Sequence, residues 1–492
     1  MSPTLFPKIL KKFGVGNLMQ LEPIIGAIQF ILGLGPALMM PIILFILAIA
    51  FRQPLEKAAR AAITVGIGFI GIFAVLGAIL GVVADVVSTM VANWGLTLEG
   101  LDIGWPLTAA ITWAFWVSAM IIPIGFIVNI VLLIPGWTDT FDADLWNYWH
   151  WAFTAVMVQM WTGNVSLAII IAIIVEIIIL KLADWTAPLA QVYFNIPGTS
   201  LPHTETVNWA PYALAIDKVL RRFPALEKIK ADPESLRARL GVWGEPMMIG
   251  FYVGLFLGLV AYIPPWEINN LANIYKVAVY IAALMLLEGR MIGILMEGLL
   301  PIADGISEFF AKTERFKGRR IWIGIDAGPI GLGDPTSIAV GIILIPLYVA
   351  TAFIPGVKIL PLADLAIVPI FAMWVAAGVR GNIASSLIGG AIIALFVVYL
   401  TNMFAWPLTQ AALEINPELV PAGLALVSSL DAGAHVLPFF IIAIVLGLMT
   451  GDLYYTIVGI IIAVTWFGCW WWARDMPEVV AEEIKKLMGA EE

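Results

Sequence analysis

The sequence predicts an all-α integral membrane protein with about eleven transmembrane helices, arranged as two inverted five-helix repeats with re-entrant segments and amphipathic helices. Three observations support this prediction: the composition, the recurrence of long apolar blocks, and an internal duplication. Hydrophobic residues make up 61% and charged residues 12% of the 492-residue chain, whereas soluble domains carry about 25% charged residues. This balance excludes an ordinary soluble domain.

Apolar blocks long enough to cross a bilayer as helices recur along the whole chain. We place them at residues 25–51, 61–83, 108–134, 146–161, 165–182, 247–263, 275–300, 336–354, 362–377, 383–400 and 437–472. The last block has room for one helix and a preceding re-entrant piece. Residues 1–24 are expected to be a retained N-terminal extension, because their lysines are not followed by a clean apolar run with a small-residue cleavage site.

Basic residues predict the orientation, because cytoplasmic loops of membrane proteins carry an excess of lysine and arginine. Groups of basic residues follow the first span, fill segment 216–243 and follow the seventh span, whereas the turn at 264–274 has none. An N-terminus outside and a C-terminus in the cytoplasm put all three groups in the cytoplasm, although the lysines near residue 10 fit this less well. Segment 216–243 is then a cytoplasmic linker, and residues 475–492 form a cytoplasmic tail.

The two halves of the chain resemble each other in six short stretches that occur in the same order. The pairs are Gly35-Pro-Ala-Leu-Met-Met40 with Gly244-Glu-Pro-Met-Met248, Ala84-Asp85 with Ala303-Asp304, Leu101-Asp-Ile-Gly104 with Ile325-Asp-Ala-Gly328, Ala143-Asp-Leu145 with Ala363-Asp-Leu365, Gly163-Asn164 with Gly381-Asn382, and Pro188-Leu-Ala-Gln191 with Pro407-Leu-Thr-Gln410. The halves, 25–215 and 244–436, hold five spans each, so the second enters the membrane from the opposite side; residues 437–474 form the final transmembrane region. Inverted repeats interrupted by glycine and proline are typical of transporters, whose substrate site lies between the repeats. The duplication therefore predicts a transporter.

His150 is an ionisable residue in an apolar span, and such residues need a reason because they are costly in a bilayer. It lies in Trp146-Asn-Tyr-Trp-His-Trp151 at the start of the fourth span. One interpretation is an aromatic belt at the membrane interface. The other, which we favour, is a site for a polyhydroxyl ligand, because C–H faces stack on rings while hydroxyl groups bond to imidazole.

Two glycine- and proline-rich stretches precede spans at equivalent positions, Gly104-Trp105-Pro106 and Gly328-Pro-Ile-Gly-Leu-Gly-Asp-Pro-Thr336. They are either surface turns or bent backbone at membrane depth whose free N–H and C=O groups bind a ligand. Asp102 and Asp326 precede these stretches. Helix capping is the favoured role for Asp102, and capping and ligand binding both stay open for Asp326.

Four further charged residues lie in or beside the spans. Glu245 begins a span, where the helix dipole favours a carboxylate, so capping and ligand binding are both open. Glu288 and Arg290 lie on different faces of one helix, and partners on other helices with a structural role are favoured. Glu176 is expected to be buried with a partner or to lie near an interface.

Motifs of enzymes and nucleotide-binding proteins are absent from the sequence. It contains no Walker motif, dinucleotide fingerprint, zinc-ligand spacing or nucleophile elbow, so we expect no catalytic residue, metal or cofactor. Cys469 is the single cysteine and cannot form a disulfide within the chain. The net charge of −9 forms no charged tail, which makes nucleic acid an unlikely partner.

The stretch Gly198-Thr-Ser-Leu-Pro-His-Thr-Glu-Thr206 is mirrored in the second half. It follows residues 188–191 as Val427-Ser-Ser-Leu-Asp-Ala-Gly433 follows residues 407–410. A loop that only connected two spans would have no reason to be mirrored. We therefore place Pro202-His203 at the tip of one of two opposed re-entrant segments, where His203 bonds to a ligand hydroxyl.

Together, these motifs resemble the galactitol-specific enzyme IIC, the membrane permease component of a bacterial sugar phosphotransferase system. The resemblance covers about residues 27–470 and rests on Leu34-Gly-Pro-Ala37, Gly66-Ile-Gly-Phe-Ile-Gly71, Asp102-Ile-Gly-Trp-Pro106, Asp144-Leu-Trp-Asn-Tyr-Trp-His150, Lys181-Leu-Ala-Asp-Trp185, Pro202-His203, Gly244-Glu-Pro246, Gly324-Ile-Asp326 and Arg380-Gly-Asn382. The repeat organisation is more distantly similar to that of the ascorbate enzyme IIC.

The resemblance implies a homodimeric carrier in a bacterial or archaeal cell membrane, in which a mobile core domain carries a polyol or sugar past a fixed scaffold domain in an elevator-type movement. A separate IIB protein, supplied by IIA, would phosphorylate the substrate from its own phosphocysteine, so Cys469 is not a phosphocarrier. Likeness to the ascorbate carrier places substrate contacts at Trp105, His150, Thr154, His203 and the stretch Asp326–Thr336, which includes Asp334; Thr204 and Glu245 complete the candidate binding residues. Trp105, His150, His203 and Asp326 also match the galactitol family's stretches.

Two stretches depart from the family pattern. Thr204-Glu-Thr206 stands where galactitol carriers have Gly-Thr-Ser, and Gly331-Leu-Gly-Asp-Pro335 stands where a Gly-His-Thr type of sequence is expected. Both lie in expected ligand regions and leave the identity of the polyol open. An alternative is an uncoupled or cation-coupled secondary transporter in which Glu205 and Asp334 bind a proton or cation. A membrane-embedded enzyme is disfavoured because no catalytic constellation emerges.

Overall fold

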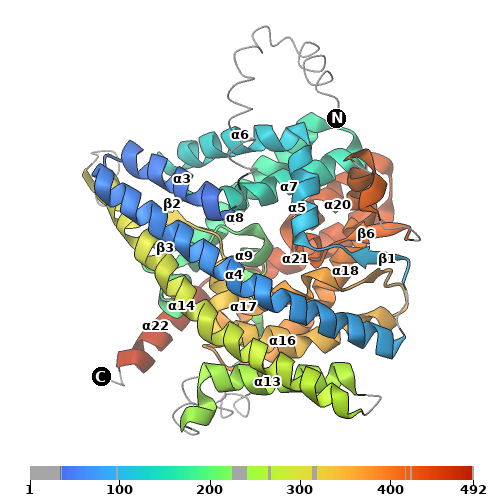
Figure 1. Cartoon of the computed structure of the whole chain (residues 1–492). Coiled ribbons are helices and arrows are strands. Elements are labelled where there is room, and N and C mark those ends of the chain that lie inside the picture. The colour runs from blue at the N-terminus through green and yellow to red at the C-terminus, as the bar shows by residue number, and fades with distance from the viewer. Residues whose placement is uncertain are drawn as a thin grey trace.

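The computed structural model describes residues 34, 36–95, 98–223, 241–263, 267–312, 319–415, 417–420 and 424–489, and this part of the chain is mostly helical (Figure 1). The N-terminal extension and most of the linker predicted at 216–243 lie outside the described residues. Five described helices are long and apolar enough to cross a membrane: Trp116–Leu133, Val165–Tyr193, Pro335–Phe353, Ile383–Ile415 and Leu453–Trp472. The predicted class, an all-α membrane protein, is confirmed, whereas the number of eleven spans is not.

The elements follow one another in an order that occurs twice, apart from short 3₁₀ helices. The first run is α3 (Pro36–Ala50), α4 (Leu55–Trp94), β1 (Gly100–Asp102), α5 (Trp105–Ala114), α6 (Trp116–Leu133), β2 (Thr140–Asp142), α7 (Leu145–Thr162), α8 (Val165–Tyr193), β3 (Thr199–Ser200), α9 (Thr204–Val207) and α10 (Ala210–Leu220). The second is α13 (Pro246–Tyr262), α14 (Ile268–Lys312), β4 (Trp322–Gly324), α15 (Gly328–Gly333), α16 (Pro335–Ala350), β5 (Ile359–Leu360), α17 (Val368–Gly378), α18 (Ile383–Ile415), β6 (Leu426–Ser428), α19 (Leu430–Gly433) and α20 (Val436–Thr450). Helices α21 (Leu453–Trp472) and α22 (Met476–Gly489) end the chain, and the short helix η5 (Ala363–Ile367) precedes α17.

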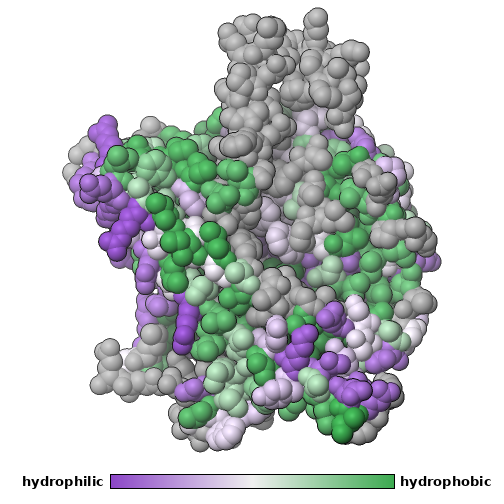
Figure 2. Space-filling view, in the orientation of Figure 1, coloured by the Kyte–Doolittle hydropathy of each residue, from purple (hydrophilic) through white to green (hydrophobic). Residues whose placement is uncertain are grey.

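Apolar side chains cover much of the visible molecular face, and polar residues gather toward its margins (Figure 2). Helix α21 exposes Leu453, Val464 and Trp471 by 66–72% each, and α4 exposes Ile63 and Ile67 by more than half. Large apolar side chains in water would be unfavourable over such an area. These faces are therefore suited to lipid.

Helices α3, α4, α13 and α14 form a tightly packed group in which α4 and α14 lie side by side (Figure 1). Gly298 of α14 faces α4 so closely that a Cβ there would lie 2.6 Å from the Val65 nitrogen. On α13, Gly254 and Gly258 face α14, where a Cβ would lie 2.7 Å from the Ala278 Cα and 2.9 Å from the Ile274 Cα. Small residues four apart permit this backbone contact between membrane helices. We call this group the scaffold and the remaining elements, apart from α22, the core.

Six short strands of the described chain form two parallel three-stranded sheets, in the orders β5-β1-β6 and β2-β4-β3. Each sheet has a central strand from one run and both flanking strands from the other. The strands lie where helices are interrupted, so they pair backbone N–H and C=O groups that would otherwise be unsatisfied in an apolar interior. The sequence did not predict these strands.

Replacing Gly324 with alanine is expected to lower the free energy of unfolding by about 1–3 kcal/mol, as overpacking of a dense interior does. Gly324 ends the central strand β4, and a Cβ there would lie 2.8 Å from the Pro202 Cγ and 2.9 Å from the Asp142 Cα. Thermal unfolding of the purified protein in detergent measures the effect. Gly468→Ala is the control, because the added carbon in α21 meets no atom within 4 Å apart from the neighbouring backbone of its own helix. Equal unfolding temperatures in both variants would contradict the strand packing.

Two predicted spans are interrupted in the structure. Block 108–134 divides into α5 and α6 because Phe115 has an extended backbone (φ −82°, ψ 135°), and the Ser118 hydroxyl donates to the Thr112 carbonyl across the break (2.7 Å). Block 437–472 divides into α20 and α21 at Gly451, whose φ is 73°. Block 362–377 holds only η5 and the eleven-residue α17. Hydropathy alone does not reveal such breaks.

The matched pair Gly163-Asn164 and Gly381-Asn382 has the same geometry in both runs. Both glycines have a left-handed backbone, with φ of 66° and 77°. Both asparagine side chains then accept a hydrogen bond from the first turn of the next helix, from the Leu167 N–H and the Ser385 N–H. The sequence match therefore corresponds to one structural device, a glycine that ends one helix and an asparagine that begins the next.

The predicted cytoplasmic tail contains a helix, α22, that packs against α8 and α10. Arg221 pairs with Glu483 of α22 at 2.7 Å and with Asp217 at 2.7 Å, and Arg380 pairs with Glu483 at 3.1 Å. The hydrogen bonds from Arg221 lower the pKa of Glu483, so this carboxylate stays ionised. The ion pairs attach the C-terminal helix to the core.

Candidate functional site

All three histidines of the chain converge in the core. His150 lies on α7, His203 precedes α9 and His435 precedes α20. The His150 Nδ1 lies 2.9 Å from the His435 Nε2, and the rings of His150 and His203 are 4.4 Å apart between centroids. All three side chains are buried, with at most 2% of each residue exposed.

The contacts of His435 fix the proton positions of two neutral imidazoles. The His435 Nδ1 lies 2.8 Å from the backbone carbonyl of Asp431, which can only accept, so this nitrogen donates. The His435 Nε2 must then accept from the His150 Nδ1–H, because a neutral imidazole carries one proton. The remaining nitrogen, His150 Nε2, keeps a lone pair, is buried and has no hydrogen-bond partner among the residues that the structure describes.

His203 faces carboxylates from both halves of the chain. Its Nε2 donates to the Asp326 Oδ1 at 3.0 Å and lies 3.8 Å from the Glu205 Oε2. Its Nδ1 lies 3.2 Å from the Thr206 hydroxyl. His203 therefore connects the segment that follows β4 with α9.

Three buried aspartates fix the backbone of the interrupted segments. The Asp144 carboxylate accepts from the N–H groups of Trp146 (2.9 Å) and Asp326 (3.0 Å). The Asp364 carboxylate accepts from the N–H groups of Trp105 (2.7 Å) and Asp431 (3.0 Å). Carboxylates that accept such bonds hold the chain at its turns.

Asp102, the third of these aspartates, was expected to cap the helix that follows it. It accepts from the N–H of Gly104, the residue before α5, and from the N–H groups of Leu362 and Asp364 at the start of η5. Asp326 likewise accepts from the Gly328 N–H at 2.8 Å. Both therefore bond to a helix start, while Asp326 also accepts from His203.

Glu205 and Asp431 are buried and their carboxyl groups contact each other. The Glu205 Oε1 and the Asp431 Oδ2 accept no hydrogen bond from any donor of the described residues. No lysine or arginine of the described chain pairs with either group. Two facing carboxyl groups need a proton or a cation between them, because each oxygen otherwise only accepts.

An aromatic series leads to the histidines. Trp105 contacts Trp146 edge to face at 5.7 Å, Trp146 stacks on Trp149 at 5.9 Å, and Trp149 contacts His150 at 4.8 Å between ring centroids. The Trp149 Nε1 is buried and donates to no described group. The series therefore combines apolar ring faces with an unused hydrogen-bond donor.

The structure brings together six of the nine candidate residues: Trp105, His150, Thr154, His203, Thr204 and Asp326. The Thr154 hydroxyl donates to the His150 carbonyl at 2.9 Å, and the Thr204 hydroxyl is buried without a partner. We call these six residues, together with Trp149, Glu205, Asp431 and His435, the histidine cluster. Sequence reasoning missed His435, Asp431 and Trp149 as site residues; the scarcity of histidine was the only available signal for the first.

The other three candidates make contacts outside the histidine cluster. Asp334 caps α16, where its Oδ2 accepts from the N–H and hydroxyl of Ser337 at 2.7 and 2.6 Å and from the Tyr193 hydroxyl. The Thr336 hydroxyl donates to the Gly381 carbonyl at 3.2 Å. Glu245 directly precedes α13 of the scaffold and makes no side-chain hydrogen bond to the first turn of that helix.

Three further charged residues of the spans were singled out from the sequence. Arg290 is exposed on α14, and the side chain of Glu288 lies outside the described residues. Glu176 is buried in α8, as expected, but its Oε1 has no hydrogen-bond partner among the described residues. The described groups, Arg290 and Glu176, therefore do not indicate a further polar site.

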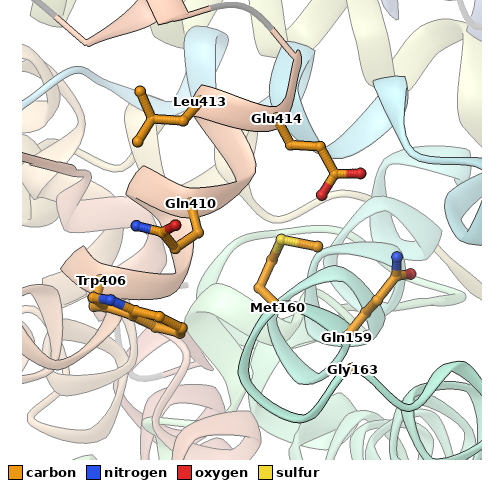
Figure 3. A pocket seen from close by; sticks show the side chains of 7 residues that line it. All are labelled: Gln159, Met160, Gly163, Trp406, Gln410, Leu413 and Glu414. Carbon is orange, nitrogen blue, oxygen red and sulfur yellow. The ribbon is translucent and has the colours of Figure 1, made fainter.

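A hollow of about 560 Å³ lies between the end of α7 and α18. Figure 3 shows Trp406, Gln410, Leu413 and Glu414 of α18 opposite Gln159 and Met160 of α7. Gln159 lies nine residues beyond His150, about 14 Å along the helix. The hollow therefore shares no residue with the histidine cluster.

Comparison with known proteins places this architecture in a family. Residues 30–423 match the family of the PTS system sugar-specific permease component, PTS being the phosphotransferase system. The chain belongs to this family. It is 36% identical over 387 residues (78% of this chain, 86% of the relative) to a permease IIC component of Escherichia coli (strain K12) whose name states no substrate. It is 31% identical over 418 residues (85% and 90%) to the PTS system galactitol-specific EIIC component of the same strain.

The family membership confirms the resemblance inferred from the sequence. The protein is a membrane-embedded permease component of a sugar phosphotransferase system. Such a component takes a sugar-type substrate and works with IIB and IIA proteins. Several of the buried polar groups that lack a hydrogen-bond partner among the described residues lie in the histidine cluster.

Proposed function

We propose that this permease takes up galactitol or a related polyol and binds it at the histidine cluster. The observation that carries the proposal is a set of buried polar atoms without a hydrogen-bond partner in the described part of the chain: the His150 Nε2, the Trp149 Nε1 and the Thr204 hydroxyl. They comprise an acceptor, a donor and a group that can do both. A polyol matches this mixture, because each of its hydroxyls donates one hydrogen bond and accepts others.

The cluster residues have distinct roles in this proposal. The His150 Nε2 accepts from one substrate hydroxyl, and the Trp149 indole donates to another. Trp105 and Trp146 pack on the C–H faces of the polyol. Asp326 positions His203 through the 3.0 Å hydrogen bond to its Nε2, and Thr154 lies one turn beyond His150.

Burial of the cluster implies that its surroundings move when substrate enters. His150, His203, Thr204 and Glu205 are each at most 4% exposed, so a polyol reaches them only after packed elements separate. We propose that the core moves as a unit against the scaffold, an elevator-type movement. Backbone contact at Gly254, Gly258 and Gly298 suits the scaffold to stay fixed.

The twofold order of elements supports two inverted repeats. Exchanging the two runs maps β1 to β4, β2 to β5 and β3 to β6, and this exchange converts the strand order β5-β1-β6 into β2-β4-β3. Each sheet therefore needs both halves of the chain. In this proposal the two broken segments, at α9 and α19, approach from opposite sides of the membrane, with the N-terminus outside and the C-terminus in the cytoplasm.

The chain supplies positioning rather than a nucleophile for phosphorylation. In the proposed cycle the core presents one polyol hydroxyl at the cytoplasmic mouth, where the phosphocysteine of IIB donates its phosphate. Because the permease holds the hydroxyl in line with the phosphate of IIB, the reaction does not depend on a rare encounter between free polyol and IIB. We further propose that the permease works as a homodimer.

A cation-coupled secondary transporter is the alternative, and the facing carboxyl groups of Glu205 and Asp431 are the observation that favours it. Uptake of radiolabelled galactitol into membrane vesicles separates the two. The phosphotransferase proposal expects galactitol phosphate inside the vesicles only when phosphorylated IIB is present. Accumulation of free galactitol without IIB, driven by a proton or sodium gradient, would overturn it in favour of the alternative.

A further inference from the structure

The histidine cluster contains the donor atoms of a metal site, which the spacing of these residues in the sequence does not show. His150, His203 and Glu205 each place one ligand atom so that all three lie within 4.8 Å of one another. The three residues come from α7, the residue before α9, and α9 itself. Imidazole nitrogen and carboxylate oxygen are the ligands that Zn²⁺ takes in tetrahedral sites.

His150 already has the tautomer that a metal ligand needs. Its Nδ1–H donates to His435, whose own Nδ1–H donates to the Asp431 carbonyl, and no described group donates to its Nε2 lone pair. Histidines that bind metals donate their second ring N–H in this way, which fixes the ring orientation. His435 is a positioning residue in this arrangement.

His203 can present its Nε2 without losing its proton. The proton is then carried on Nδ1, where the Thr206 hydroxyl lies 3.2 Å away and accepts it. This tautomer releases the Asp326 Oδ1, now 3.0 Å from the Nε2, to become a fourth ligand. Ligands held 2.0–2.2 Å from one ion lie roughly 3.4 Å apart, whereas the ligand atoms of His150, His203 and Glu205 lie within 4.8 Å of one another, so the side chains need to approach by up to about 1.4 Å.

The local charge also favours a cation. Glu205, Asp326 and Asp431 are buried or nearly so, and no lysine or arginine of the described chain pairs with them. Within the described chain, the only cationic partner available is a protonated histidine, and burial opposes that form. An ion between these groups supplies the missing positive charge.

We propose that His150, His203, Glu205 and Asp326 form a site for a divalent transition-metal ion, with Zn²⁺ the best match. The ion joins α7 and α9 of the first run to the segment that follows β4 in the second. The ion therefore holds the two halves of the core together in the arrangement in which the cluster is buried. The ion and a polyol should also compete for the His150 Nε2. This one consequence rests on the proposed function.

Metal binding by the purified full-length protein tests the proposal without any transport assay. The chain, stripped with a chelator and kept in detergent, is dialysed against Zn²⁺ alone, and bound metal is measured by mass spectrometry. One Zn²⁺ per chain is expected, with no binding of Mg²⁺ or Ca²⁺ at equal concentration. His150→Asn and Glu205→Gln should each weaken Zn²⁺ binding at least ~100-fold, whereas Asp85→Asn, at an exposed position on α4, should leave it unchanged.

The variants and a galactitol arm keep the outcomes distinct. Equal Zn²⁺ affinity in the parent, His150→Asn and Glu205→Gln proteins would overturn the metal site, because the ion would then bind adventitiously elsewhere. Zn²⁺ binding that depends on both residues but is unaffected by saturating galactitol would sustain the metal site and overturn the polyol assignment at His150. Loss of Zn²⁺ on adding galactitol would support both.

Discussion

His150→Asn is expected to lower the affinity for galactitol at least ~100-fold and to abolish uptake, while the protein stays folded. The side-chain nitrogen of asparagine occupies the place of the histidine Nδ1, so the hydrogen bond to the His435 Nε2, at 2.9 Å in the parent, is retained. Of the two ring nitrogens, the variant removes only the Nε2, which has no hydrogen-bond partner among the described residues. A site built to bond a substrate hydroxyl loses far more from such a deletion than from a lost apolar contact. Titration calorimetry with galactitol on the detergent-purified protein measures the affinity.

Two comparisons make this experiment specific to the ring nitrogen. His150→Gln returns an amide near the place of Nε2 but not of Nδ1, and should recover part of the binding that His150→Asn loses. Gln159→Ala and Trp406→Ala, which alter the hollow between α7 and α18, should bind galactitol as the parent does. Loss of binding in Trp406→Ala together with normal binding in His150→Asn would move the polyol site from the cluster to the hollow.

Rarity and location allowed His150 and His203 to be predicted from the sequence as site residues. One of these histidines lies among tryptophans at the start of a span, and the other lies in a polar break that occurs in both halves. An ionisable side chain in a membrane costs free energy, and a purely structural role would not offset that cost. His435 has neither signal, because it precedes α20 in an apolar context. Its role follows only from its contacts with His150 and the Asp431 carbonyl, which join residues 285 positions apart in the chain.

The two departures from the family pattern have different surroundings in the structure. Glu205 lies in the stretch where galactitol carriers have Gly-Thr-Ser, and the structure buries it in the cluster against Asp431. Asp334 also departs from the pattern, yet its Oδ2 bonds to Ser337 and caps α16. A sequence shows that an aspartate precedes a helix, but not which way its carboxylate turns. An N-terminal cap and a ligand site look alike before the fold is known.

The membrane class and the breaks marked by polar residues, glycine and proline were predictable, whereas the break at Phe115 and the short strands were not. Hydropathy averages over about 20 residues, so one extended residue such as Phe115 leaves the block 108–134 looking continuous. Strands of two or three residues have no periodicity to detect, since alternation needs four or more residues. The strands β1 to β6 could therefore not be predicted from the sequence. The matches Leu101–Gly104 and Ile325–Gly328 nevertheless marked two of the places where strands end.

Asp364→Ala and Asp144→Ala are each expected to lower the free energy of unfolding by about 2–5 kcal/mol. Each carboxylate accepts from two buried or partly buried N–H groups, those of Trp105 and Asp431 in one case and Trp146 and Asp326 in the other. Removing it leaves both donors unsatisfied, at about 1–3 kcal/mol each, and relief from burying a charge offsets part of the loss. Thermal and denaturant unfolding in one detergent measure the effect.

The two variants form a matched pair, because Asp144 and Asp364 occupy equivalent places in the duplicated sequence. Asp364→Asn and Asp144→Asn keep one acceptor each and should lose roughly half as much stability, while the exposed Asp85→Asn should change it by less than about 0.5 kcal/mol. Losses of similar size in both alanine variants mean that the two halves depend on the same carboxylate to hold their interrupted segments. A large loss of stability in one alanine variant and almost none in the other would contradict this. The two halves would then share the order of their elements but not the interactions that stabilise them.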